Sequence, residues 1–305
     1  MIAIDWGSTS LRAYRIDDFG SVREQRRADI GALGQDGHHA TILATQIAGW
    51  DDECIALCGM VGARGGWHEA AYVDCPADTR SIAAQMLDVA VDRSPLHGRS
   101  VRIVPGVIDR GGHDRVGFDR VTNGVADVMR GEETQVIGLI HGASDPPDAV
   151  CLPGTHSKWV SLRDGAITSV CTAMTGEAYA LLRRQSVLAR LMSAEDAPFD
   201  AASFDAGVRR SGEPGGLLHH LFGVRTQGLL GRVSPEQAPA YLSGMLIGHE
   251  IRARLPLPAI VHLIASDHLA NAYARALANL GTEARVHPEG LAARGMFALL
   301  QAQSQ

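Results

Sequence analysis

Hydrophobic positions divide the chain into short apolar segments separated by turns of Gly, Ser and Thr. Residues 1–5 are largely apolar, and residues 11–16 alternate between apolar and polar side chains. Alternation with a period of two is typical of a half-buried β-strand, so the two segments predict a β-hairpin. Residues 149–152 and 158–162 repeat this order of strand, small-residue turn and strand. The pattern therefore predicts two halves that begin in the same way.

The rest of the chain alternates apolar runs with segments of helical periodicity, which is typical of α/β proteins. Further strands are predicted at residues 54–60, 101–107, 166–172 and 259–265. Helices are predicted at residues 41–48, 80–91, 123–140, 177–192, 235–253, 269–280 and 290–301. The segment 141–148 contains Gly, Ser and two Pro residues and interrupts the helical pattern. We therefore predict a first domain of residues 1–142 and a second of residues 143–305, with the last helix free to pack back on the first.

Net charge and composition indicate which kinds of partner the protein can bind. The formal net charge is -6, and Lys and Arg form no run that would mark a nucleic-acid or anionic-membrane surface. The chain has no apolar run of the roughly 18 residues that a membrane helix requires, and its first residues lack the features of a signal peptide. The five cysteines are irregularly spaced, which favours free thiols in a reducing compartment over a zinc site. We expect a cytoplasmic protein with small-molecule ligands.

The first candidate site is the turn after the first strand, Asp5-Trp6-Gly7-Ser8-Thr9-Ser10. Backbone N–H groups and hydroxyls in such a turn can surround phosphate oxygens. Asp5 is suited to hold Mg²⁺ through water, because this ion prefers oxygen ligands and keeps much of its hydration shell. An ordinary hairpin turn, rich in Gly and Ser for backbone reasons, is the competing interpretation.

The second candidate site is the corresponding turn of the second half, Gly154-Thr155-His156-Ser157-Lys158. It lacks the G-x-x-x-x-G-K-[ST] spacing of a Walker loop. Lys158 is the only lysine of the chain, which favours a chemical role over a solvating one. Two phosphate-type turns, one opening each half, can hold one nucleotide between them. Lys158 is the first choice for the phosphates, and His156 takes that role if alternation along the strand directs the lysine away.

The third candidate site is the glycine-rich loop after the strand at residues 54–60. Arg64 offers a planar fork suited to a carboxylate, Trp67 can stack on a sugar face, and Glu69 can accept hydrogen bonds from hydroxyls. A surface loop with Trp67 packed as a lid is the alternative interpretation.

The fourth candidate is the polar segment at residues 123–135, which carries Asp127, Arg130, Glu132, Glu133 and Thr134 within about two helical turns. Most of these side chains would form a solvated helix face. The acidic residues still make the segment a candidate for binding a metal or substrate, or for supplying a catalytic base.

With these motifs in view, the sequence resembles the 2-dehydro-3-deoxygalactonokinase family, within the superfamily of sugar kinases, heat-shock ATPases and actin. The resemblance rests on DWGSTSLRAYRID, GMVGARGGWHEAAYVDCPA, DVMRGEETQ, LPGTHSKWV and MTGEAYALLRRQSVL, in this order along nearly the whole chain. It implies two RNase H-like domains with a cleft between them, and ATP-dependent phosphorylation of the 6-hydroxyl of 2-dehydro-3-deoxy-D-galactonate in galactonate catabolism. Two positions depart from the pattern: Ala63 stands where Ser is expected, and Ala265 stands where Gly is usual in the adenosine segment that contains Ser266.

The combined expectation is a kinase that binds ATP-Mg²⁺ across the two turns, with the sugar acid held mainly by the first domain. Asp127 is the first candidate for the general base, and Glu132 and Glu69 are the runners-up; Glu132 is also a candidate substrate ligand. A kinase of another sugar acid, an enzyme that forms an acyl phosphate, and a non-catalytic sugar-sensing regulator on the same scaffold are the alternatives. The sequence leaves a homodimer open.

Overall fold

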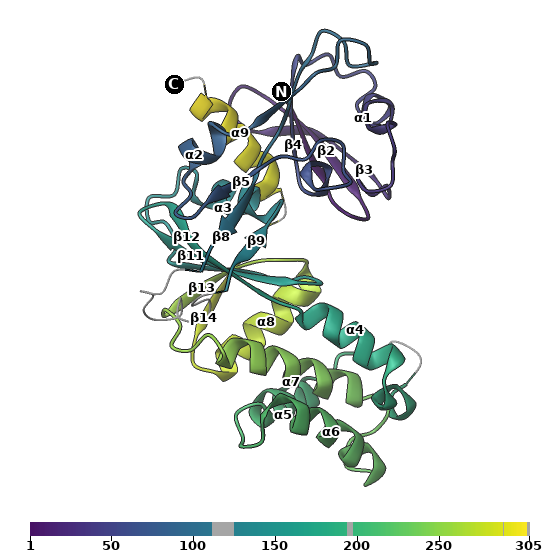
Figure 1. Cartoon of the computed structure of the whole chain (residues 1–305). Helices are drawn as coiled ribbons and strands as arrows, with labels where there is room; N and C mark the ends of the chain where they lie inside the picture. Colours follow the sequence, from purple (N-terminus) through teal and green to yellow (C-terminus); the bar gives the residue numbers. More distant parts are fainter. Residues whose placement is uncertain (112–124, 194–197, 289, 304–305) are drawn as a thin grey trace.

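The computed structural model describes residues 1–111, 125–193, 198–288 and 290–303. Two mixed β-sheets form the centres of its two parts, and helices cover them (Figure 1). A third, three-stranded sheet lies where the two parts meet.

The first sheet has the strand order β3-β2-β1-β4-β7-β6. Its strands are β1 (Ile2–Trp6), β2 (Leu11–Ile16), β3 (Val22–Ala28), β4 (Cys54–Cys58), β6 (Leu87–Val89) and β7 (Ser100–Ile103). β1, β2 and β3 form an antiparallel meander, and β4 and β7 then add in parallel to β1. The interior strands β1 and β4 are apolar on both faces, as expected of a sheet covered on both sides.

The second sheet repeats this order as β12-β11-β10-β13-β14. Its strands are β10 (Ala149–Leu152), β11 (Ser157–Arg163), β12 (Ala166–Ala173), β13 (Ile260–Ile264) and β14 (Glu283–His287). β10, β11 and β12 are antiparallel, and β13 and β14 run parallel to β10. The two sheets thus share one topology, which agrees with the repeat predicted from the hydrophobic pattern.

The small third sheet connects the two parts. It contains β5 (Tyr72–Asp74), β8 (Gly106–Asp109) and β9 (Asp127–Met129) in the order β5-β8-β9. Buried Asp109 accepts a hydrogen bond from the backbone of Val170 in β12, and Asp127 accepts one from Thr172 in the same strand. These side chain–backbone bonds fix the small sheet to the second large sheet.

The helices are α1 (His39–Gln46), α2 (Thr79–Ala83), α3 (Glu132–Ile140), α4 (Thr175–Gln185), α5 (Ala201–Arg210), α6 (Gly216–Leu229), α7 (Ala238–Arg252), α8 (Asp267–Asn279) and α9 (Leu291–Gln303). The C-terminal helix α9 returns to the N-terminal part and lies beside α2 and α3 (Figure 1). Close approach of α3 and α9 needs glycine: a Cβ on Gly138 would lie 2.0 Å from Leu291 O, and one on Gly295 would lie 1.9 Å from Thr134 O. This contact fixes α3, whose first turn carries Glu132.

Three predicted elements are wrong. The helix predicted at residues 80–91 is the short α2 followed by β6, and the strand at 101–107 is split by Pro105 into β7 and β8, which belong to different sheets. The helix predicted at 123–140 begins only at Glu132, because β9 precedes it; its first two residues lie outside the described part of the chain. Tertiary pairing outweighed local periodicity in these segments. The domain boundary at residue 142 stays a prediction.

Candidate active site

A cavity of about 550 Å³ lies between the turn of the β1–β2 hairpin and the turn of the β10–β11 hairpin. Both turns, the β9–α3 connection and the end of β13 contribute to its wall. The predicted site residues that line it are Asp5, Gly7, Ser8, Glu132, Gly154, Thr155, His156, Lys158 and Ser266. The chain therefore brings turns that are about 150 residues apart in sequence to one place.

In the first turn, Asp5 projects into this cavity next to Arg12, its partner across the β1–β2 pair. Arg12 Nη1 lies 3.5 Å from Asp5 Oδ2. Burial raises the pKa of Asp5, and the nearby guanidinium of Arg12 opposes the shift. Arg12 also lines the cavity, although sequence reasoning did not select it. The signal was available: in a two-stranded hairpin, Arg12 is the residue opposite Asp5.

The hydroxyls of the first turn are not equivalent. Ser8 lines the cavity, whereas Thr9 and Ser10 are not among its lining residues. The backbone carbonyl of Ser10 instead accepts a hydrogen bond of 2.9 Å from Gly7 N, which closes the turn. Only part of the predicted hydroxyl cluster therefore faces the space between the hairpins.

The second turn presents Gly154, Thr155 and His156 to the cavity. His156 Nε2 is 2.5 Å from Glu177 Oε2 at the start of α4. Ser157 is fully buried, and its hydroxyl lies 2.7 Å from the hydroxyl of Tyr273 in α8, so the side chain points beneath the turn.

Lys158 is a largely buried residue at the wall of the cavity. Its ammonium donates to Val128 O at 2.8 Å and to Thr172 Oγ1 at 2.7 Å. An ammonium has three donors, so one N–H remains beyond these two bonds. Lys158 can therefore donate this N–H to a ligand, while its other two bonds join β11 to β9 and β12.

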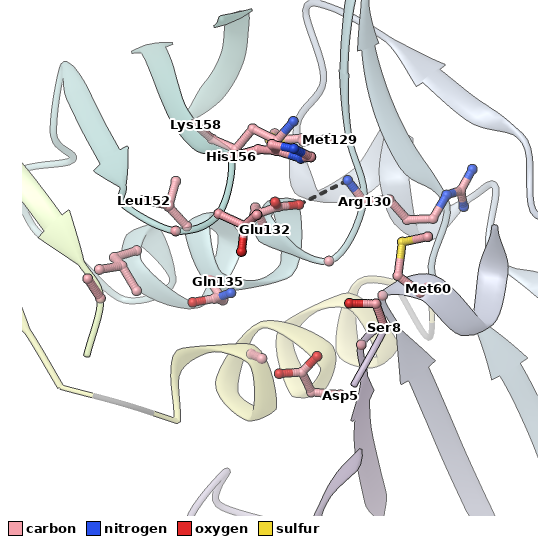
Figure 2. A pocket seen from close by; sticks show the side chains of 18 of the residues that line it. Asp5, Ser8, Met60, Met129, Arg130, Glu132, Gln135, Leu152, His156 and Lys158 are labelled. Carbon is pink, nitrogen blue, oxygen red and sulfur yellow. Dashed lines mark hydrogen bonds between the residues drawn. The ribbon is translucent and has the colours of Figure 1, made fainter. Parts of the chain in front are cut away.

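Glu132 projects into the cavity from the first turn of α3, with Asp5 on one side and Lys158 on the other (Figure 2). Its Oε2 accepts a hydrogen bond of 3.0 Å from Arg130 N. Burial raises the pKa of Glu132, the charge of Lys158 opposes the shift, and the charge of Asp5 adds to it. A carboxylate with a raised pKa at a cavity wall is a candidate proton acceptor.

The neighbouring Glu133 is fully buried and does not line the cavity. Its Oε2 accepts a hydrogen bond of 2.7 Å from Gly131 N. Burial and the charge of Glu132 raise the pKa of Glu133 to about 8. A carboxyl with this pKa is mostly protonated at neutral pH, and of these two adjacent acids only Glu132 lines the cavity.

Asp127, the first candidate for the base, is not among the residues that line the cavity. Its Oδ1 accepts hydrogen bonds from Val128 N at 2.7 Å and Thr172 Oγ1 at 2.6 Å, and its Oδ2 accepts from Thr172 N at 2.5 Å. These bonds use the carboxylate to join β9 to β12. Thr172 Oγ1 in turn accepts from Lys158, so Asp127 supports that lysine through one intervening hydroxyl.

The glycine-rich loop places its three predicted ligands away from the cavity lining. Arg64 and Glu69 are exposed, and Trp67 is partly buried with its ring stacked on His39 at 6.0 Å between centroids. Trp67 therefore packs on the first domain, as in the alternative interpretation of this loop.

Arg130 is a second cavity residue that sequence reasoning did not assign. Its guanidinium lies 4.3 Å from the ring centroid of Tyr72, and Nη2 donates to Ala70 O at 2.8 Å. Its buried Nε and Nη1 have no hydrogen-bond partner among the described residues. Buried guanidinium N–H groups are usually paired, which makes Arg130 a candidate for an anionic ligand.

A second cavity of about 570 Å³ adjoins the first, and Gly154 lines both. Its walls come from α4, α7 and α8 and include Tyr179, Phe199, Leu269 and Tyr273. Ser266 lines the first cavity and is the N-cap residue of α8, without a side-chain bond to the helix. Ala265 also lines the first cavity.

The donor set can be compared with what a divalent cation requires. Among the described residues, no group of three or more His, Cys, Asp and Glu side chains is placed to hold a metal ion directly. The carboxylates of Asp5 and Glu132 nevertheless offer oxygen donors on the same cavity. This set fits Mg²⁺, which is commonly held by one or two carboxylates, water and substrate phosphates.

Comparison with known proteins gives the same assignment as the motifs. The family model described as 2-keto-3-deoxy-galactonokinase matches residues 5–299. The chain belongs to this kinase family. A Rhizobium meliloti protein named "Probable 2-dehydro-3-deoxygalactonokinase" is 36% identical over 293 residues, which cover 93% of this chain and 90% of the relative. The 2-dehydro-3-deoxygalactonokinase of Escherichia coli is 34% identical over 288 residues, covering 92% and 90%.

Solved structures agree with this family and fold. A Sinorhizobium meliloti protein described as a 2-dehydro-3-deoxygalactonokinase matches with a TM-score of 0.83 and 35% identity, covering 99% of this chain and 95% of the other. The activator of 2-hydroxyisocaproyl-CoA dehydratase from Clostridium difficile matches with a TM-score of 0.51 at 11% identity, covering 100% and 96%, and shows the fold alone. The predicted kinase family and the actin-like ATPase fold are confirmed. No helix in the described part of the kinase has the length and apolar character to cross a membrane.

Proposed function

We propose that this kinase transfers the terminal phosphoryl group of ATP to the 6-hydroxyl of 2-dehydro-3-deoxy-D-galactonate, giving 2-dehydro-3-deoxy-6-phospho-D-galactonate. The observation that carries the proposal is the cavity between two phosphate-type turns, which Asp5, Glu132, Arg12 and Lys158 all line. Relatives at 34% and 36% identity carry the name of this activity. Phosphoryl transfer depends mainly on positioning and charge, and this cavity offers both.

The nucleotide is assigned to the second hairpin and its surroundings. The second cavity, with Tyr179, Phe199 and Tyr273 in its wall, suits the flat apolar face of adenine. From there the phosphates would pass Gly154 to the turn at Thr155 and His156. The N-terminus of α8 also lies at the first cavity, where its partial positive charge favours phosphate oxygens.

The residues of the first hairpin act on the transferred phosphoryl group. Asp5 would hold Mg²⁺ through water, and Mg²⁺ when bound supplies positive charge to the phosphate oxygens. Arg12 and Lys158 contribute fixed positive charge from opposite sides of the cavity. In this arrangement residues 1–142 bind mainly the sugar acid and residues 143–305 mainly the nucleotide.

Glu132 is our candidate for the general base. Its carboxylate faces the cavity, whereas that of Asp127 is occupied by Thr172 and Val128. In the transfer step, Glu132 accepts the proton of the 6-hydroxyl, whose oxygen forms the bond to phosphorus as the bond to ADP breaks. The exposed Glu69 is not among the residues that line this cavity.

The test is an ADP-coupled assay on a panel of sugar acids that differ at C4 and in the 2-keto group. We expect the highest kcat/KM for 2-dehydro-3-deoxy-D-galactonate, with strict dependence on a divalent cation. A higher kcat/KM for another sugar acid would move the assignment to that substrate. Absence of turnover on the whole panel would contradict the proposal.

A further inference from the structure

Four buried side chains form a hydrogen-bonded network beneath the second hairpin. Ser157 Oγ is 2.7 Å from the hydroxyl of Tyr273, and this hydroxyl donates to Glu250 Oε2 at 2.7 Å. Trp159 Nε1 donates to Glu250 Oε1, also at 2.7 Å. The exposed fraction of Glu250 is only 7%, and it lines neither cavity. The network joins β11 to α7 and α8.

The direction of each bond follows from the chemistry of the donors. An indole N–H can only donate, so Trp159 requires an acceptor. Burial raises the pKa of Tyr273, which therefore stays protonated and donates a hydrogen bond to Glu250. The oxygen of Tyr273 is then available to accept from Ser157. Glu250 consequently sets the orientation of the Ser157 hydroxyl at the base of the turn, although the two residues do not touch.

Glu250 also reaches the element on the other side of the turn. Burial raises the pKa of Glu250, and the Thr175 hydroxyl at the start of α4 opposes this shift together with Trp159 and Tyr273. The next residue, Gly176, packs on the tip of the turn so closely that a Cβ would lie 2.3 Å from Gly154 O. Thr175 and Tyr273 both line the second cavity. One buried carboxylate thus joins the phosphate turn to two walls of the cavity assigned to adenine.

We propose that Glu250 is a positioning residue for the nucleotide: through Tyr273 and Thr175 it holds the Gly154–Ser157 turn and the second cavity in one fixed arrangement. The proposal rests on the proposed function, because it takes the turn to bind ATP phosphates. A turn held in advance binds its ligand without the entropic cost of ordering it. Loss of one partner would leave the others buried and unpaired, which weakens the whole network.

Two conservative substitutions test the proposal. Glu250→Gln keeps the size of the side chain but places an amide donor against the donors of Trp159 or Tyr273. Tyr273→Phe removes only the hydroxyl that joins Ser157 to Glu250. Each should weaken the Kd of ADP-Mg²⁺ about tenfold by calorimetry, the scale expected for one buried hydrogen bond to a charged group. The KM for ATP should rise in parallel, while the KM for the sugar acid stays within about twofold.

The chain offers a matched control in the same strand. Ser161 Oγ makes a buried hydrogen bond of 3.0 Å to Ser169 Oγ, farther from the turn along β11. Ser161→Ala therefore removes a comparable buried bond from the same sheet. It should lower the melting temperature without changing the Kd of ADP.

Three outcomes would overturn the proposal. These are an unchanged Kd of ADP in folded Tyr273→Phe, an equal loss of affinity in Ser161→Ala, and a sugar-acid KM that rises as much as the ATP KM. Should Glu250→Gln not fold, Tyr273→Phe decides alone. The ADP measurement needs no sugar acid, so a wild-type protein that binds ADP but phosphorylates no sugar acid would contradict only the proposed function. A wild-type protein that fails to bind ADP would contradict both.

Discussion

The two hairpins at the cavity have the same backbone plan and different side chains. Each is an antiparallel pair whose first strand also pairs in parallel with a later strand, β1 with β4 and β10 with β13. A glycine packs against the turn of each: a Cβ on Gly31 would lie 2.0 Å from Ser8 O, and one on Gly176 would lie 2.3 Å from Gly154 O. The repeated topology therefore includes the support of the turn as well as the turn itself.

The side chains divide the chemistry between the hairpins. The first carries the carboxylate Asp5 beside Arg12, at the wall of the cavity. The second carries no acid; its Ser157 and Lys158 are buried and bonded to other elements. We infer that the first hairpin serves the metal and the transferred group, and that the second is a rigid seat for the nucleotide. Substitutions in each hairpin can test this difference.

The largest effect is expected at Glu132, which lines the cavity between the two hairpins. Glu132→Gln removes the proposed base and should lower kcat by about 10³-fold, within the range for general base catalysis. The base acts in its ionised form, so kcat/KM should fall as pH decreases through the pKa of Glu132. Because burial raises this pKa, the acidic limb should lie above the ordinary value for Glu. An Asp127→Asn variant with the greater loss of kcat would return the role to Asp127.

Asp5→Asn should lower kcat by about 100-fold or more, because it removes an electrostatic element aimed at the reacting phosphoryl group. If the first hairpin serves the metal, this variant should also need more Mg²⁺ than the wild type for half-maximal activity. Lys158→Met should lower kcat without changing the Mg²⁺ requirement or the KM for the sugar acid. Initial rates over a Mg²⁺ titration measure both. Equal Mg²⁺ dependence in the two variants would remove the proposed division between the hairpins.

The next effect in size is expected when a methyl group is added to the glycine that packs against each turn. Gly31→Ala and Gly176→Ala place a methyl group against a backbone carbonyl, and overpacking of this kind costs about 1–3 kcal/mol. We expect Gly176→Ala to raise the KM for ATP, and Gly31→Ala to lower kcat with ATP binding preserved. Gly223 in α6 has no atom within 4 Å of an added Cβ, so Gly223→Ala is the neutral control. A rise in the ATP KM in both variants would mean that the turns act alike.

A smaller effect is expected on the KM for the sugar acid, and it should differ between Arg130 and Arg64. Arg130→Ala is expected to raise the KM for the sugar acid about tenfold, by loss of one charge-assisted hydrogen bond. Arg64→Ala, which alters an exposed side chain, should change this KM less. Steady-state kinetics with ATP saturating compares the two. The reverse order would restore Arg64 as the carboxylate ligand.

The sequence predicted the two hairpins because their strands alternate clearly and their turns contain small residues. It did not predict β3, whose sequence Val-Arg-Glu-Gln-Arg-Arg-Ala is mostly polar, since an edge strand exposed to water needs no apolar face. It also gave residues 127–131 to a helix, because the pairing of β9 with β8 is a long-range contact that local periodicity does not encode.

The candidate site shows the same pattern: residues in local motifs were predicted, and residues that depend on long-range contacts were not. Asp5 and the second turn were predicted from local motifs, and both line the cavity. Arg12 and the support of the turn by Glu250 were missed, because each depends on a partner that is distant in sequence or on the opposite strand. Arg130 was named in the fourth candidate segment but was given no role of its own. Asp127 was chosen because it precedes the predicted domain boundary, near the expected cleft, and its hydrogen bonds to Thr172 became visible only with β12 beside it.

The last prediction concerns the stability of the first part of the molecule instead of its catalysis. Glu133 has an ordinary pKa of 4.5, and burial with the charge of Glu132 raises its folded pKa to about 8. A carboxyl whose pKa is raised by folding stabilises the protein fully below the unfolded pKa, and this contribution is lost as pH rises through the folded pKa. The wild type should therefore lose stability between about pH 4.5 and pH 8 through this residue.

Glu133→Gln removes the titration but keeps a neutral group that can still accept the hydrogen bond from Gly131. The melting temperature of the variant relative to the wild type should therefore rise steadily from pH 5 to pH 8, by roughly 2–4 °C for each kcal/mol of stability. Exposed Glu53 provides the control, since Glu53→Gln should give a nearly constant difference over this range. A constant difference for Glu133→Gln as well would mean that Glu133 is ionised in the folded protein. Two adjacent negative charges would then lie at the start of α3, and the assignment of Glu132 as the single base would lose its electrostatic support.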